Sequence, residues 1–194
     1  MNDDFLIWDS AVVPNACCLA QLVNVDDQFE LPKGIPRAAT FPSDAAFTMD
    51  PDFPNDMLLT DNLVNTDRLV IASARLKTFL ESQALQRVEY LPVTILNHKG
   101  RSASRDYFIV HPVELDACVD LGASDVEWSI IDPASIDSVT SLVIDEHALD
   151  PGVALFRPKP FYDIVLVRRP LAEAIDAQGF SGIRWIELSS YPEL

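Results

Sequence analysis

The side chains of this sequence that could do chemistry gather between residues 111 and 150. The segment ELDACVDLGASD places Asp116 and Asp120 four residues apart, with Cys118 between them. Paired carboxylates can transfer protons or hold Mg²⁺, and a thiol beside the imidazole of His111 or His147 could act as a nucleophile. One hypothesis is therefore a small hydrolase or transferase that uses Asp116, Asp120 and His147.

A second acidic cluster, DEHALD, brings Asp145, Glu146, His147 and Asp150 close together. It could hold a cation, although an acidic turn after a strand has the same composition. No two histidines have the spacing of a metal site, and the sequence contains no nucleophile elbow, Walker loop, EF-hand loop or paired CxxC. We therefore expect no cofactor, no metal and no enzymatic activity.

Charge is the most informative bulk property. The chain of 194 residues has 30 acids against 14 bases, for a net charge of −16. Residues 106–156 carry eleven carboxylates and no Lys or Arg, whereas residues 68–105 are basic. This acidity argues against nucleic acid or an anionic membrane as a ligand, since both bind cationic surfaces. It favours a partner with a basic surface, although acidity also serves solubility alone.

The base-free stretch contains turns such as DLGAS and DPAS, which bring carboxylates to the surface. Trp128 lies among these acids and could anchor a partner, because aromatic side chains dominate binding hot spots. The alternative is that Trp128 belongs to the core. We predict a protein-binding surface made of Asp116, Asp120, Asp125, Glu127, Trp128 and Asp132.

One structural unit recurs along the chain. Residues 69–93 and 164–188 align without a gap at an offset of 95, although only three positions are identical. Each has an apolar run, a polar break, two apolar residues four apart and a second apolar run, which predicts strand, helix and strand. We expect Leu171 and Ile175 to be buried against a sheet. Because QGFSG follows the second helix, Gly179 should end that helix and not bind phosphate.

The first sixty residues hold six prolines, which interrupt long elements. We expect residues 1–66 to form a proline-rich acidic arm and residues 67–194 to form the core. The predicted fold class is α+β: a single domain over residues 1–194, with a mixed, mostly antiparallel sheet of roughly six strands and a few helices. Cys17, Cys18 and Cys118 make a poor disulfide framework, so we expect reduced thiols in a cytoplasmic protein.

Residues 69–188 contain, in order, LVIASARLKTFLE, DYFIVHPVELDACVDLGAS, LVIDEHALDPGVALFR and DIVLVRRPLAEAIDAQGFSGIRWIEL. This order resembles the bacterial polymorphic-toxin immunity protein 11 family. The first sixty residues carry little of the pattern, and Arg168 and Arg169 stand where the family more often has serine. The resemblance implies a cytosolic protein, usually encoded beside a secreted toxin, that binds and inactivates that toxin. It implies no catalytic residue.

The residues and the resemblance favour the same hypothesis, an immunity protein that neutralises a cognate toxin by steric and electrostatic occlusion. The expected partner is a toxin with a basic surface, and neither nucleic acid nor membrane is expected. Besides the hydrolase or transferase, a third hypothesis is an acidic mimic of nucleic acid that binds a DNA-binding protein. The sequence leaves a homodimer open and does not identify the toxin.

Overall fold

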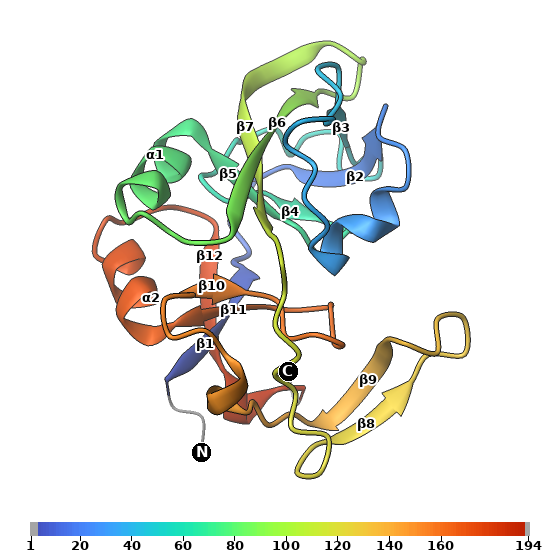
Figure 1. The fold of residues 1–194 in the computed structure, drawn as a ribbon. Helices are drawn as coiled ribbons and strands as arrows, with labels where there is room; N and C mark the ends of the chain where they lie inside the picture. The colour runs from blue at the N-terminus through green and yellow to red at the C-terminus, as the bar shows by residue number, and fades with distance from the viewer. Residues whose placement is uncertain (1–3, 193–194) are drawn as a thin grey trace.

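The computed structural model describes residues 4–192, and Figure 1 shows its fold. The chain forms a single-domain α+β fold with mainly antiparallel sheets and some parallel pairing, which confirms the predicted fold class. Among residues 4–192, no helix is long and apolar enough to cross a membrane. The strands in chain order are β1 (Phe5–Ser10), β2 (Cys18–Val23), β3 (Ala46–Met49), β4 (Val64–Asn65), β5 (Val70–Ser73), β6 (Val88–Leu96), β7 (Ser102–Pro112), β8 (Asp125–Trp128), β9 (Ile136–Ser141), β10 (Leu155–Phe156), β11 (Val165–Arg168) and β12 (Ile183–Glu187).

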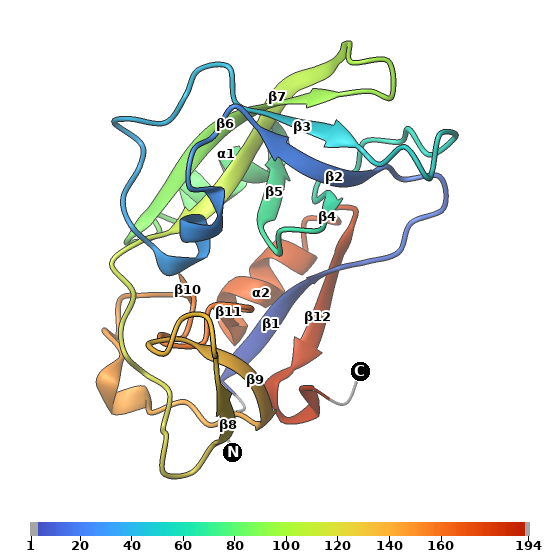
Figure 2. The ribbon, with the colours of Figure 1, turned by 90° about the vertical axis from the view of Figure 1, so that its right-hand side faces the viewer.

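These strands form two sheets and a separate hairpin, where the sequence analysis predicted one sheet. One sheet has the order β4-β2-β3-β6-β7-β5, the other has β10-β11-β1-β12, and β8 and β9 form a two-stranded sheet. The α-helices are α1 (Ala74–Ser82) and α2 (Arg169–Asp176), and the 3-10 helices are η1 (Gln28–Lys33), η2 (Glu146–Ala148) and η3 (Leu188–Ser190). The two sheets lie one above the other in Figures 1 and 2, and the helices α1 and α2 lie next to each other on one side.

Both predicted strand–helix–strand units are confirmed. The first is β5-α1-β6 and the second is β11-α2-β12. The equivalence extends to the backbone, because Ala84 and Gly179, 95 residues apart, both have a positive φ of about 50° to 65°, as do Arg87 and Gly182 at φ 55° and 82°. Gly179 lies just beyond the end of α2 with φ 63°, as expected of a left-handed helix end.

Each unit encloses a strand from elsewhere in the chain. β7 lies between β5 and β6, and β1 lies between β11 and β12, antiparallel to both neighbours in each case. The register is the same in the two units, as these pairs show: Val70 with Val110 and Leu91 with Ile109, then Val165 with Trp8 and Ile186 with Ile7. The N-terminal strand is therefore an inner strand of the C-terminal sheet.

The segment before residue 67 contributes strands to both sheets. β1 pairs with β11 and β12, and β2 and β3 are inner strands of the six-stranded sheet. The four residues Phe5 to Trp8 are all buried, which fits a strand covered on both faces. The division of the chain into an arm and a core at residue 66 stays a prediction.

The two units pack against each other through their helices. Leu76 and Leu80 of α1 and Leu171 and Ile175 of α2 belong to one buried cluster, so the predicted burial of Leu171 and Ile175 is confirmed. At the edge of this cluster the Phe79 and Phe180 rings lie 5.6 Å apart between centroids. The helices thus cover a core that both units share.

A polar junction at Asp61 and Asn62 joins the same two units. The Asp61 carboxylate accepts hydrogen bonds from the Ser73 hydroxyl at 2.8 Å and from the Ser181 N–H and hydroxyl at 3.0 Å each. Ser73 is the N-cap of α1 and Ser181 belongs to the GFSG loop. The Asn62 amide donates to the Gly182 carbonyl at 2.8 Å. GFSG is therefore a structural contact between the two units.

Gly182 is required by this contact. Its φ is 82°, and a Cβ placed there would lie 2.2 Å from the Asn62 carbonyl oxygen. A side chain at this position would combine backbone strain with a clash that the backbone cannot avoid.

Truncating the helix face that packs on the shared core should destabilise the protein. We predict that Leu171→Ala and Ile175→Ala each lower the free energy of unfolding by about 2–5 kcal/mol, because each leaves a cavity in a packed core. Urea denaturation measures the effect. The control is Glu173→Ala on the exposed face of α2, and a loss below about 0.5 kcal/mol for the two core variants would show that this face is not packed.

Removing the Asp61 carboxylate should loosen the junction. We predict that Asp61→Ala lowers the free energy of unfolding by about 2–3 kcal/mol at pH 7, because several donors lose their acceptor. The control is Asp52→Ala, since Asp52 is exposed.

The effect of Asp61 should depend on pH. Burial raises the pKa of the Asp61 carboxyl, but hydrogen bonds from Ser181 and Ser73 and the charge of Arg75 outweigh burial, so the pKa is lowered overall. A lowered folded-state pKa stabilises the protein above the unfolded pKa of about 3.9, and this contribution is lost as the pH falls. The difference between wild type and Asp61→Ala should therefore shrink below about pH 4, and a difference that grows there would contradict the assignment.

Candidate functional site

The β8–β9 hairpin carries most of the predicted binding surface. It stands away from both sheets in Figure 1, and the loop between its strands lies at the far end. One side is anchored, because Ile136 and Val139 are buried in the core under the four-stranded sheet and Val126 packs against them. The Ile136 N–H also donates to the Pro160 carbonyl at 3.0 Å. The hairpin therefore has a fixed base and a face open to solvent.

Two of the predicted acids are engaged in ion pairs. Asp116 contacts Arg87 at 2.9 Å, and Arg87 also contacts Asp150 at 3.2 Å. Asp132 contacts Lys33 of η1 at 3.1 Å. The pKa of Asp132 is lowered, first by the hydrogen bond from the Ser135 hydroxyl and then by Lys33. Both carboxylates thus hold local structure as well as adding negative charge.

The other acids of the predicted surface accept hydrogen bonds or face solvent. Asp120 accepts hydrogen bonds from the N–H groups of Gly122 and Ala123 and so closes the DLGAS turn. Asp125 is exposed, and the exposed Glu127 accepts one hydrogen bond from the Ser138 hydroxyl across the hairpin at 2.9 Å. Asp125 and Glu127 are therefore the two acids of this set that are exposed.

Trp128 is at the surface of the hairpin. Trp128 is 46% exposed, so it does not belong to the core. Beyond it the loop presents Ile130 and Ile131, which are 97% and 96% exposed. The sequence analysis missed these two isoleucines. Their signal was an apolar pair between the acids of a turn-rich segment, SIIDPAS.

The residues of the enzymatic alternative have other local roles. Asp116 and Asp120 make the contacts described above, and His147 is exposed on η2, where its backbone N–H donates to the Asp145 carboxylate. Cys118 is fully buried, and burial raises its pKa to about 12, so it stays a thiol at neutral pH. Across residues 4–192, no group of three or more His, Cys, Asp or Glu side chains is arranged to hold a metal ion.

His111 is likewise held by local structure. It is buried, burial lowers the pKa of its imidazole, and Nε2 lies 2.9 Å from the Ile35 carbonyl oxygen. At neutral pH it is therefore a neutral side chain whose Nε2–H can donate to a backbone carbonyl. This contact gives His111 a structural role.

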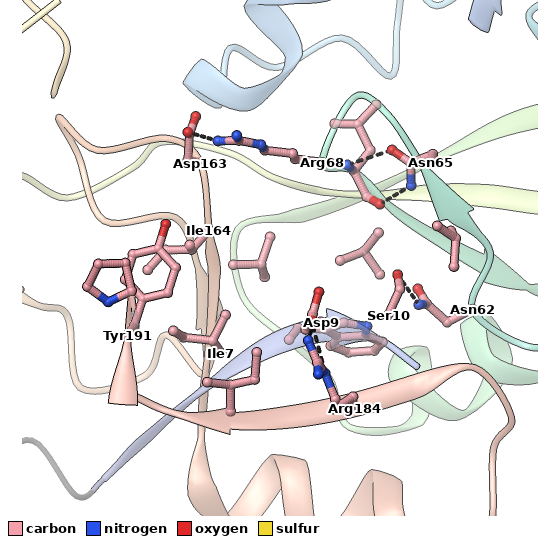
Figure 3. A pocket seen from close by; sticks show the side chains of 17 residues that line it. Ile7, Asp9, Ser10, Asn62, Asn65, Arg68, Asp163, Ile164, Arg184 and Tyr191 are labelled. Atoms are coloured by element: carbon pink, nitrogen blue, oxygen red, sulfur yellow. Dashed lines mark hydrogen bonds and ion pairs between the residues drawn. The ribbon is translucent and has the colours of Figure 1, made fainter. Parts of the chain in front are cut away.

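A cavity of about 490 Å³ lies between the two sheets, and Figure 3 shows its lining. Its acids are paired, Asp9 with Arg184 and Asp163 with Arg68. Asn65 is occupied as well, since its amide bonds to the backbone of Leu63, Asp67 and Leu69. The ion pairs neutralise the charges that face this cavity, and the pairs join segments distant in sequence. The charged groups that line this cavity therefore already have partners within the protein.

Comparison with known proteins identifies a family that this chain matches over most of its length. The model of the immunity protein family Imm11 matches residues 13–190, which is nearly the whole chain. The match reaches well into the first sixty residues, where the sequence pattern indicated little similarity. None of the curated proteins matches this chain.

The burial of the cysteines gives a direct test of the thiol assignment. We predict that titration of the denatured, unreduced protein detects all three free thiols of the structure. In the native protein only Cys18 should react promptly, because Cys17 and Cys118 are buried and burial raises their pKa values to about 11 and about 12. Ellman's reagent measures both states. A count of one thiol after denaturation would reveal a disulfide, and prompt reaction of Cys118 would revive a nucleophilic role.

Proposed function

Since the chain belongs to the Imm11 immunity protein family, we propose that it binds a cognate toxin in the cytoplasm and neutralises it by covering the toxin's working surface. The surface that makes this contact is the open face of the β8–β9 hairpin with the DLGAS turn beside it. The observation that carries the proposal is the half-exposed Trp128 on a hairpin whose strands and loop contain no base.

Electrostatics supports a partner with a basic surface. The hairpin belongs to residues 106–156, which carry eleven carboxylates and no Lys or Arg. Such a field raises the rate of encounter with a cationic surface and repels an anionic one. A toxin that acts on nucleic acid or another anionic substrate needs such a cationic surface. Occupying it would block the substrate, and the immunity protein would need no catalytic group for this.

The six predicted residues divide into two roles under this proposal. Asp125, Glu127 and Trp128 contact the toxin directly, and Asp120 adds charge from the neighbouring turn. Asp116 and Asp132 support the surface through Arg87 and Lys33. Trp128 would be buried near the centre of the interface with the toxin, with the charged residues around it. Aromatic side chains in such positions carry much of the binding energy of protein interfaces.

The alternative hypotheses make different predictions. A nucleic-acid mimic would bind DNA-binding proteins in general, whereas an immunity protein should prefer its own toxin. A hydrolase or transferase would lose turnover on Asp120→Asn while its fold stays intact. The proposed function requires no turnover and predicts that Asp120→Asn affects only binding.

Neutralising the exposed acids of β8 should slow association with the toxin. We predict that Asp125→Asn with Glu127→Gln lowers the association rate constant roughly 3–10-fold at low salt and flattens its salt dependence. The probe is the toxin domain that we expect to be encoded beside the gene of this chain, because the family resemblance implies such a neighbour. Biolayer interferometry measures the rates. Lysate pull-down with the wild-type chain should retain the same domain.

The matched control removes the same charge elsewhere. Glu173→Gln with Asp176→Asn takes two exposed carboxylates from α2. If both double variants slow association equally, only net charge matters and the hairpin is not the contact surface. If the wild-type chain does not bind the toxin domain at all, the proposed function is wrong.

A further inference from the structure

The most unusual surface feature of the described chain is the apolar tip of the β8–β9 hairpin. Ile130 and Ile131 follow one another in the loop and are 97% and 96% exposed. A single exposed apolar residue is ordinary, but two adjacent isoleucines at the end of a projecting hairpin expose almost all of their apolar area. The rest of the described chain therefore buries almost none of either side chain.

The backbone that presents these isoleucines is held in place. The Ser129 N–H donates to the Ser135 carbonyl at 3.0 Å, and the Ser129 hydroxyl accepts from the N–H groups of Ile131 and Asp132 at 3.3 Å each. Asp132 closes the loop through the Ser135 hydroxyl at 2.8 Å. The loop therefore has little conformational freedom left to lose on binding, which favours affinity.

Lys33 ties the loop to the rest of the molecule. Its ammonium group contacts the Asp132 carboxylate at 3.1 Å from the last residue of η1. Because residues 106–156 contain no base, this contact brings a cation to the loop from outside the stretch. The two isoleucines thus lie at the end of a loop whose backbone is held by hydrogen bonds and by this ion pair.

The surroundings of the tip indicate what could cover it. Asp125, Glu127 and Asp137 are exposed on the two strands behind the loop, and Trp128 lies at the end of β8. An apolar centre with an acidic surround complements an apolar recess with a basic rim. Burial of the isoleucines would supply affinity, and the charges would supply orientation and rate.

We propose that Ile130 and Ile131 form a plug that inserts into an apolar recess within the basic surface of the toxin. This inference rests on the proposed function and makes it more specific, because it assigns the binding energy to the loop and not to the acids.

The test removes the apolar tip without touching the charges. Ile130→Ser with Ile131→Ser should weaken the affinity for the neighbouring toxin domain about 100-fold, since burial of each isoleucine is expected to contribute about tenfold. The loss should appear mainly in the dissociation rate, whereas the acid variants change the association rate. Both side chains are exposed, so the melting temperature should stay unchanged.

Val12→Ser is the matched control, because Val12 is 97% exposed and lies between β1 and β2, outside the hairpin. The inference is supported if the tip variant dissociates faster and the control does not. It is overturned if the tip variant binds as tightly as wild type while wild type still neutralises the toxin, an outcome that leaves the proposed function standing. Absence of binding by the wild-type chain overturns both.

Discussion

The fold depends on how two strand–helix–strand units are joined, and the joint is the carboxylate of Asp61 with its neighbour Asn62. A single carboxylate accepts from Ser73, which caps α1, and from Ser181, which follows α2 in the GFSG loop. A partly buried acceptor that serves both units fixes their relative position, because any shift would leave donors without a partner. The helices then close over one apolar core, and the sheets place the β8–β9 hairpin at their periphery.

Local elements were predictable from the sequence, but their partners were not. The units at residues 69–93 and 164–188 follow from apolar periodicity, from Pro170 in the first turn of α2 and from Gly179 after it. Nothing local says that β1 enters the C-terminal sheet, because pairing between residues 5–10 and 165–187 depends on tertiary contacts. The run FLIW held a signal, since four consecutive buried positions suit an inner strand.

The candidate site shows the same division between local and long-range information. Acidic turns in a base-free stretch led to the hairpin that we propose as the binding surface, but pairing of Asp116 with Arg87 and of Asp132 with Lys33 involves bases far away in sequence. Ile130 and Ile131 resemble core residues in a sequence, and only the hairpin geometry exposes them. An isolated two-stranded hairpin is marginally stable by itself, so its anchoring through Ile136 and Val139 is what gives this hairpin a fixed shape.

The central claim is that the toxin is held by the β8–β9 hairpin. Hydrogen–deuterium exchange of the chain with and without the neighbouring toxin domain tests it most directly, because it maps the contact without any substitution. We predict slower exchange in residues 125–141, centred on the loop between the strands. Protection confined to residues 28–58 or to the helices α1 and α2, with the hairpin unchanged, would contradict it.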